Sequence, residues 1–370
     1  MTEIDSHDID SHDIDTGRPA FDELRQLPLT EWHPRAQVAL PVTEVLRPRV
    51  PAIDIHNHLG RWLSDGEWMI PDVDALLTIM DECGVDTIVN LDGMWGDEVT
   101  ANVERYDAAH PGRFLTFCQL DWSLLAQPDG AAALIASLDD SAARGARGVK
   151  VWKNLGLTFR DDDRSLILPD DPRVVAVLQH AGDLGLPVLI HSADPRAFFE
   201  PLDENNERLD ELLQQRDWWF GDHAVHPTFE RLLDAHAALV SAAPGTTFIG
   251  AHFGCAAEEL DRVEHLLEAC PNYTVDIAGR MAELGRQPRR VAALIARHPD
   301  RVLFGTDIYP ATAEQFRLHY RFLESADEAF EYAPGSTVPP QGRWNVSALD
   351  LDEASLGAIY RDNAIRVLGL

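Results

Sequence analysis

Two histidines separated by one residue, His56 and His58, end a short β-branched and apolar run, Ala-Ile-Asp-Ile-His-Asn-His. In a β-strand, side chains at positions i and i+2 point to the same face, so the two imidazoles project together. Two neutral imidazoles placed in this way can share one metal ion. A pair of structural histidines fits the same spacing, so other residues must decide between the two interpretations.

Further residues that can ligate a metal end other strand-like runs: His191 ends Pro-Val-Leu-Ile-His, His252 ends Ile-Gly-Ala-His and Asp307 ends Phe-Gly-Thr-Asp. In a closed parallel barrel, all carboxyl ends of the strands meet at one mouth. Each residue alone could be a hydrogen-bonded loop residue, and Asp307 could cap a helix. Their joint position at strand ends instead favours a metal site.

The ligand set of imidazole and carboxylate favours Zn²⁺, with Mn²⁺ or Fe²⁺ as alternatives. A catalytic metal keeps one position open for water and lowers the pKa of that water. Asp307 would then act as a ligand, as a general base, or as both.

Eight short apolar runs alternate with helical patterns, and this alternation positions the candidate ligands. The runs are 52–56, 87–91, 114–117, 148–152, 187–191, 247–252, 273–277 and 301–307. Stripes with a 3.6-residue period occupy 73–83, 98–109, 130–144, 172–185, 227–243, 257–269, 288–298 and 311–325. Eight strand–helix pairs predict an α/β fold, a (β/α)8 TIM barrel. An open doubly wound sheet is the rival, but no glycine-rich phosphate loop follows the first strand.

The chain divides into three predicted parts. We predict a disordered acidic tail for residues 1–17, which repeat Ile-Asp-Ser-His-Asp. For 18–50 we predict an irregular lead-in with a short helix near Phe21–Leu27. A single barrel is predicted for 51–370. Two long segments, one after strand five (194–226) and one after helix eight (326–350), are rich in aromatic residues and predict lids.

The composition excludes several classes of partner. The 370 residues carry a formal net charge of −31, which repels nucleic acid and anionic lipid. No run of 18 apolar residues predicts a membrane helix, and the N-terminus lacks the pattern of a secretory signal. We therefore expect a cytoplasmic protein that acts on a small molecule.

The motifs Asp-Ile-His-Asn-His, Gly-Val-Lys-Val-Trp-Lys-Asn, Pro-Val-Leu-Ile-His, Phe-Ile-Gly-Ala-His and Leu-Phe-Gly-Thr-Asp resemble the strand-end motifs of the amidohydrolase superfamily. The closing Arg-Asp-Asn-Ala-Ile-Arg-Val-Leu-Gly-Leu is similar to the last helix of its amidohydrolase-related branch. The resemblance covers about residues 51–370. It implies the barrel, a homodimer, and His56, His58, His191 and Asp307 as metal ligands. It also implies His252 as a second ligand or as a catalytic acid or base.

Lysine occurs only at Lys150 and Lys153, so 29 of the 31 basic residues are arginine. In binuclear members that the chain resembles, a lysine on strand four becomes a carbamate that bridges two metals, and Lys150 holds the matching position. Arginine cannot deprotonate to undergo this reaction. Lys150 could equally be a charge partner for Asp307 or for a substrate carboxylate, and Lys153 is the less favoured carbamate carrier.

Residues that follow the strands could bind substrate: Arg280, Trp152, Lys153 and Trp62. Arg280 could hold a substrate anion or pair with a surface acid, and the tryptophans, with Trp95 and Trp122, could line the mouth or pack internally. Asp54 is predicted to make a structural hydrogen bond.

Three functions remain open. The first is hydrolysis of an amide, lactone or ester by metal-activated water, with Asp307 relaying the proton and one or two Zn²⁺ ions bound. The second is nonoxidative decarboxylation, or hydration, of an unsaturated or aromatic acid, with His252 and Asp307 handling the proton at carbon. The third is a noncatalytic barrel, because four protein ligands could close a structural zinc site.

Overall fold

The computed structural model describes residues 21–28, 31–32, 34 and 37–370. The chain forms two units, Met1–Ala39 and Leu40–Leu370. In the first unit, α1 spans Phe21–Leu24, within the predicted short helix. The predicted acidic tail, 1–17, lies outside the described residues. Everything that follows concerns the second unit.

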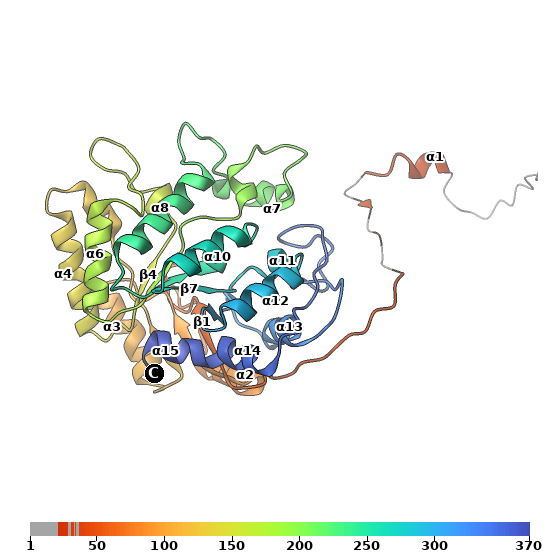
Figure 1. The fold of residues 1–370 in the computed structure, drawn as a ribbon, viewed down its shortest axis with the longest axis horizontal. Helices are drawn as coiled ribbons and strands as arrows, with labels where there is room; N and C mark the ends of the chain where they lie inside the picture. Colours follow the sequence, from red (N-terminus) through yellow and green to blue (C-terminus); the bar gives the residue numbers. More distant parts are fainter. Residues whose placement is uncertain (1–20, 29–30, 33, 35–36) are drawn as a thin grey trace, which may run out of the picture. The chain divides into compact units, whose positions relative to one another are not determined.

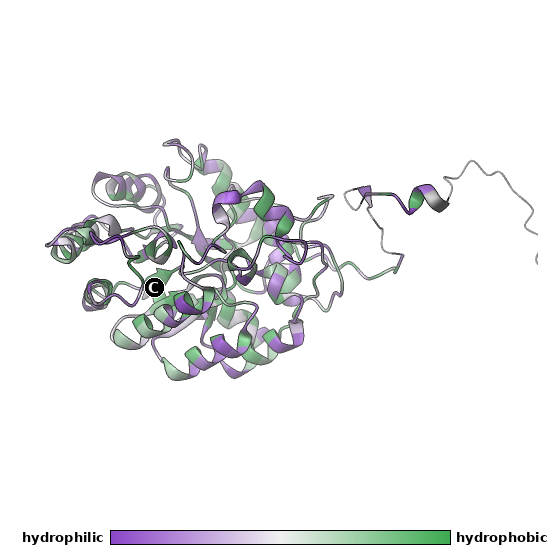
Figure 2. Cartoon of the chain, turned by 90° about the horizontal axis from the view of Figure 1, so that it is seen from above, coloured by the Kyte–Doolittle hydropathy of each residue, from purple (hydrophilic) through white to green (hydrophobic). Residues whose placement is uncertain are grey.

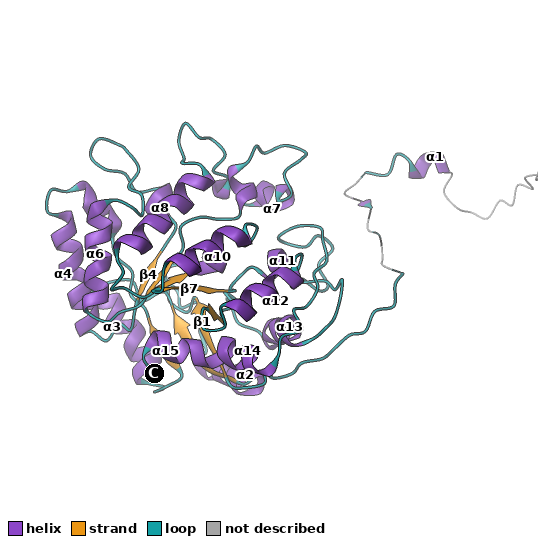
Figure 3. Ribbon diagram, viewed as in Figure 1, coloured by secondary structure: helices purple, strands orange, loops and turns teal. Residues whose placement is uncertain are grey.

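Eight parallel strands form the centre of this unit, and each lies in or overlaps a predicted run (Figure 3). They are β1 (Ala52–Asn57), β2 (Val85–Asn90), β3 (Phe114–Thr116), β4 (Val149–Val151), β5 (Val188–Ile190), β6 (Phe248–Gly250), β7 (Tyr273–Asp276) and β8 (Val302–Leu303). Regular pairing follows the order β1-β2-β3 and the order β4-β5-β6-β7-β8.

Backbone hydrogen bonds join the two groups of strands at both seams. Between β3 and β4, the Cys118 amide donates to the Gly148 carbonyl at 2.9 Å, and the Lys150 amide donates to the Cys118 carbonyl at 2.7 Å. Between β8 and β1, the Asp307 amide donates to the His56 carbonyl at 2.8 Å. The strands therefore close into the predicted (β/α)8 barrel.

Helices surround the strands, and Figure 1 shows α4, α6, α8, α10 and α12 following one another around them. Their bounds are α2 (Val73–Cys83), α3 (Asp97–Val103), η2 (Glu104–Ala108), α4 (Gly130–Ala143), α6 (Pro172–Asp183), α8 (Phe229–Ala242), α10 (Leu260–Ala269), α12 (Pro288–Arg297) and α13 (Ala313–Glu324). Side chains of Asp72, Asp171 and Thr228 cap the free amides that begin α2, α6 and α8. Figure 2 shows helices with both hydrophilic and hydrophobic residues, as expected of helices that bury one face.

Shorter helices complete the fold. They are η3 (Trp122–Ala126), α5 (Asn154–Leu157), α9 (Ala251–Gly254), α11 (Met281–Leu284), α14 (Glu353–Gly357), η6 (Ala358–Asp362) and α15 (Asn363–Leu368). Among the described residues, no helix has the length and the apolar run that crossing a membrane would require.

The apolar core has two layers. Ile53, Leu189, Ile249 and Leu303 come from strands on different sides of the cylinder and form one buried cluster, so this cluster fills the barrel interior. A larger buried cluster lies between the strands and the surrounding helices. The polar side chains of the site are therefore set at the carboxyl end of a rigid apolar barrel.

The two long segments lie where the sequence predicts them, one after the fifth strand and one after the eighth helix of the barrel. The segment between β5 and α8 contains η4 (Arg196–Phe199), α7 (Leu209–Gln214) and η5 (Arg216–Trp218). The segment between α13 and α14 folds back on itself, because the amides and carbonyls of Phe330 and Val346 exchange hydrogen bonds of 2.8 and 2.9 Å.

Candidate metal centre

His56 and His58 are both buried, and a buried carboxylate orients each ring. The Nδ1 of His56 lies 2.8 Å from Asp276 Oδ2, and the Nδ1 of His58 lies 2.7 Å from Asp92 Oδ1. A carboxylate that accepts the Nδ1 proton leaves Nε2 free to bind a cation, as second partners of metal-binding histidines do. Both rings therefore present an unprotonated Nε2 to the mouth.

Asp307 lies opposite these two nitrogens. Its Oδ1 is 3.5 Å from His58 Nε2 and 3.9 Å from His56 Nε2. Two atoms that bind one ion at about 2.1 Å each can be no more than about 4.2 Å apart, so the separations allow a shared ion. Asp307 adopts a φ of +58°, in the left-handed region. Such strain in a non-glycine residue is concentrated at functional sites.

His252 sits on a left-handed turn that directly follows β6. His252, Phe253 and Cys255 have φ values of 58°, 58° and 59°. The turn is anchored because the His252 amide donates to Asp276 Oδ1 at 2.8 Å, and the ring Nδ1 lies 2.8 Å from the Ala278 carbonyl. Asp276 thus positions His56 and the backbone of His252 at once.

His191 is brought beside His252, with ring centroids 4.4 Å apart. Its Nε2 lies 3.2 Å from Asp194 Oδ1, and Asp194 also forms an ion pair with Lys153. Burial opposes ionisation of Asp194, yet Lys153 and His191 hold the pKa of this carboxyl well below its usual range. Burial lowers the pKa of His191 to about 3, so its ring is neutral.

Lys150 is fully buried in the centre of this group. Its Nζ lies 3.3 Å from His56 Nε2 and 5.2 Å from the Trp152 ring centroid. Burial lowers the pKa of Lys150 to about 8, although Asp307 and Asp276 oppose the shift. Burial, with help from Lys150, also lowers the pKa of His56 well below its usual value.

The residues present fit a bound cation. Ligand atoms of His56, His252 and Asp307 all lie within 4.8 Å of one another. Two buried atoms beside them, Asp307 Oδ1 and His191 Nδ1, have no hydrogen-bond partner among the described residues. Buried polar atoms without partners are costly, and a cation would satisfy both kinds of acceptor. His58 and His191 lie beside this group of three, at its two sides.

Among the described residues, one other group of potential ligands, Glu264, Glu268 and His298, lies on α10 and just after α12. These residues are partly or fully exposed, and Glu264 is already paired with Arg297. Exposed acidic groups of this kind are common without a metal, so we place the centre in the barrel mouth.

Aromatic residues surround one side of the mouth. Trp62, Trp95, Trp122 and Trp152 all line a narrow hollow that also contains Lys150. The Trp62 and Trp152 rings meet edge to face at 4.9 Å, and Trp152 also contacts the rings of His58 and His191. The four tryptophans that follow the first four strands are thus brought together.

Arg280 follows β7 and is only 7% exposed. Among the described residues, the one hydrogen bond of its guanidinium runs from Nη1 to the Gly279 carbonyl, at 2.9 Å. Its positive charge contributes to the lowered pKa of His252 and opposes the burial that raises the pKa of Asp307. Lys153, in contrast, is held by Asp194, with the Trp218 ring centroid 5.0 Å from its Nζ.

Asp92, Asp194 and Asp276 were not singled out from the sequence. Asp276 ends β7 and Asp92 follows β2, so both carried the signal that selected Asp307, a carboxylate at a strand end. Asp54 makes the predicted structural contacts: it accepts hydrogen bonds from the Thr306 amide at 3.0 Å and the Asn57 side chain at 3.2 Å.

Comparison with known proteins agrees with this geometry. A family model described as amidohydrolase matches residues 53–370. No curated protein matches the sequence significantly.

Solved structures share the fold at low sequence identity. A 2,6-dihydroxybenzoate decarboxylase from Rhizobium has a TM-score of 0.53 and 17% identity, covering 86% of this chain and 99% of its own. A dihydroxybenzoic acid decarboxylase from Polaromonas sp. JS666, with bound manganese and the inhibitor 2-nitroresorcinol, has a TM-score of 0.54 and 14% identity, covering 87% and 97%. An amidohydrolase from Burkholderia multivorans with bound HEPES has a TM-score of 0.51 and 16% identity, covering 87% and 100%.

Proposed function

The chain belongs to the amidohydrolase family, and on this premise we propose that it is a metal-dependent enzyme that decarboxylates a small aromatic or unsaturated carboxylic acid without oxidation. His56, His58, His191 and Asp307 are the proposed ligands, and His252 is a further ligand or a proton donor. Zn²⁺ or Mn²⁺ suits this set of imidazole and carboxylate groups.

The observation that carries the substrate class is the charge of the mouth. The chain has a net charge of −31, and 62 acidic residues are available to pair with cations. Within the part of the chain that the structure describes, no carboxylate lies at ion-pairing distance from Lys150 or Arg280, and Asp307 acts on both charges only from farther away. A buried cation without a direct ion pair is costly, and an incoming carboxylate would relieve that cost. The substrate is therefore proposed to be an anion.

The aromatic side chains beside Lys150 favour a substrate with an aromatic or conjugated group. Trp62 and Trp152 offer apolar contact to the edge of such a group, while the hollow that they line, of about 80 Å³, does not enclose a whole ring. The decarboxylases with the same fold act on, or bind, dihydroxylated benzenes, as their names state. Their low identity extends the fold alone, so the substrate class of this chain rests on its own cations and tryptophans.

The roles of the residues follow from their positions. A bound metal would polarise an oxygen of the substrate and fix its orientation. Arg280 and Lys150 orient the carboxylate. In the reaction, the bond between the carboxylate carbon and its neighbour breaks, carbon dioxide leaves, and the electron pair on the remaining carbon takes up one proton. We assign that proton to His252 and Asp307, and their position beside both the centre and Gly279 supports this assignment.

The proposal is tested by incubating Mn²⁺- and Zn²⁺-loaded protein with unsaturated monocarboxylic acids and with benzoates that carry hydroxyl groups, both with and without a second aryl ring. We expect release of carbon dioxide and uptake of one solvent deuteron at the vacated carbon, measured by NMR. Turnover of amide, lactone or ester substrates, with no carbon dioxide from any acid, would overturn the assignment.

Hydrolysis is the second candidate, and the position of Lys150 favours it. Its Nζ lies 3.3 Å from a proposed ligand, where a carbamate could bridge two ions. Metal analysis separates the two functions. One ion per chain with an unmodified Lys150 supports decarboxylation, and two ions with a carboxylated Lys150 support hydrolysis. The homodimer and the cytoplasmic location stay predictions.

A further inference from the structure

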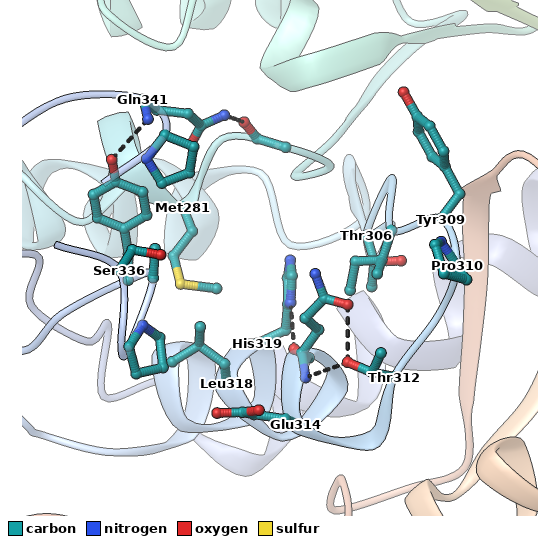
Figure 4. A pocket seen from close by; sticks show the side chains of 17 residues that line it. Met281, Thr306, Tyr309, Pro310, Thr312, Glu314, Leu318, His319, Ser336 and Gln341 are labelled. Carbon is teal, nitrogen blue, oxygen red and sulfur yellow. Dashed lines mark hydrogen bonds between the residues drawn. The ribbon is translucent and has the colours of Figure 1, made fainter. Parts of the chain in front are cut away.

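A second and larger cavity lies beside the metal centre, next to the connections that follow β7 and β8. It has a volume of about 580 Å³ and is formed by the connection after β8, by α13, and by the loop from Tyr332 to Gln341 (Figure 4). Since a cavity of about 150 Å³ is enough to hold benzene, this one has room for more than one ring.

The cavity shares its walls with the centre. Thr306 and Ile308 line it, and they flank the proposed ligand Asp307 in the chain. Gly279 lines it as well. A Cβ at Gly279 would stand 3.5 Å from both Asp307 Oδ2 and His252 Nδ1. His252 and Asp307 do not line the cavity themselves, but Gly279 puts no side chain between the cavity and these two groups, to which we assign proton handling.

The lining of the cavity is apolar with neutral hydrogen-bonding groups. Met281 and His319 point into it from α11 and α13 (Figure 4), and Leu318 and Ile308 add apolar surface. His319 donates through Nδ1 to the Gln315 carbonyl at 2.8 Å, which leaves its Nε2 as an acceptor. Among the described residues that line the cavity, none is lysine or arginine, and Glu314 contributes a carboxylate.

We propose that this cavity is a substrate subsite that takes a bulky, uncharged and mainly apolar substituent of the acid. The inference rests on the proposed function, because it places the carboxylate at Arg280 and Lys150 and the remainder of the molecule past Gly279. The substrate is then larger than a single-ring benzoate. A second anionic group would be rejected, since Glu314 repels it and no cation in the lining compensates.

Binding of four probes to the Zn²⁺-loaded protein tests the subsite by calorimetry: benzoate, biphenyl-3-carboxylate, biphenyl-3,3'-dicarboxylate and neutral 3-phenylphenol. We expect biphenyl-3-carboxylate to bind at least about ten-fold more tightly than benzoate, because the second ring is removed from water. The dicarboxylate is expected to lose that gain. Equal affinity for the first two probes, or no binding by any probe, would overturn the inference.

Two variants that fill the cavity locate the effect. They are Ser336→Trp, at an exposed loop residue, and Met281→Trp, at a buried residue. If the buried substitution prevents folding, Ser336→Trp still tests the subsite. Both are expected to abolish the advantage of the second ring and to leave benzoate unchanged. Thr337→Trp is the matched control, since Thr337 neighbours Ser336 but does not line the cavity. Equal weakening of benzoate and biphenyl-3-carboxylate by Ser336→Trp would contradict the subsite.

The neutral probe separates this inference from the proposed function. If 3-phenylphenol binds and Ser336→Trp removes its binding, the subsite stands even where Arg280→Met leaves benzoate binding unchanged. In that case the proposed carboxylate site is wrong and the cavity remains a ligand site.

Discussion

Asp276→Asn is the substitution that best tests how the candidate ligands are held. Asp276 Oδ1 accepts hydrogen bonds from the amides of His252, at 2.8 Å, and Ala278, at 3.1 Å, while Oδ2 faces His56 Nδ1 at 2.8 Å. In the variant, the amide oxygen must stay with the two backbone donors. The NH₂ group then faces His56 Nδ1 and forces the ring to accept there, so that its proton moves to Nε2. The atom proposed to bind metal becomes capped.

The size of the effect follows from this contact. A hydrogen bond to a charged group contributes about 1.5–3 kcal/mol, and every 1.4 kcal/mol is about ten-fold in affinity. We therefore expect metal affinity to fall by roughly 10- to 100-fold, the range found when such partners of ligating histidines are removed. Competition with a chromogenic chelator measures the dissociation constant for Zn²⁺.

Two further substitutions provide a parallel test and a control for Asp276→Asn. Asp92→Asn should act in the same way at His58, because Asp92 Oδ2 accepts from the Gly60 amide at 3.1 Å while Oδ1 faces the ring. Asp107→Asn is the control, a carboxylate hydrogen-bonded to Thr116 at 2.9 Å rather than to a histidine, and it should leave affinity unchanged. If Asp276→Asn folds normally and binds Zn²⁺ as tightly as the wild type, the assignment of His56 Nε2 as a ligand is refuted.

Three other predictions concern the mouth and the fold. Arg280→Met should raise the dissociation constant for benzoate by about 10-fold or more and leave the metal content unchanged. Arg289→Met, on the exposed face of α12, is the control and should leave the dissociation constant unchanged. Equal effects of the two substitutions would contradict a role for Arg280 in anion binding. Lys150→Met should abolish turnover of the acid, because it removes a charge that orients the carboxylate, whereas Lys150→Arg keeps that charge and should retain part of the turnover. Full turnover by Lys150→Met would contradict this role, and intact mass spectrometry at neutral pH should find Lys150 of the wild type unmodified. Burial lowers the pKa of His236 to about 4 from an unfolded value near 6.5, so the unfolded chain binds more protons between these values and the free energy of unfolding falls as pH drops through that window. The contribution is at most about 3.4 kcal/mol, and His236→Gln should flatten that part of the pH profile in urea unfolding. An unchanged slope would show that His236 is not the group responsible.

Much of the fold could be predicted because hydrophobic periodicity reflects burial directly. The helix α2 spans Val73–Cys83, the range predicted from its stripe, and Gly84 ends it with a φ of 73°. Boundaries were less well predicted where the chain departs from one regular helix. The stripe at 98–109 divides into α3 and a wider π-helical turn, η2, and apolar spacing cannot distinguish the two.

The candidate site could be predicted in part. Strand-end position identified His56, His58, His191, His252 and Asp307, and the structure gathers these residues at one mouth. Their carboxylate partners could not be assigned, since a hydrogen bond between residues 220 positions apart, such as that of His56 with Asp276, depends on strand order and tilt. The sequence also could not predict that the Arg280 side chain forms no direct ion pair, because a chain with 62 acidic residues offers many possible partners.

Anomalous diffraction at the zinc edge from crystals of Zn²⁺-loaded protein tests the central claim most directly. We expect a peak in the barrel mouth, within about 2.0–2.2 Å of His56 Nε2 and of an Asp307 carboxylate oxygen. A peak only at Glu264, Glu268 and His298, with none between His56 and Asp307, would contradict a catalytic metal centre in this protein.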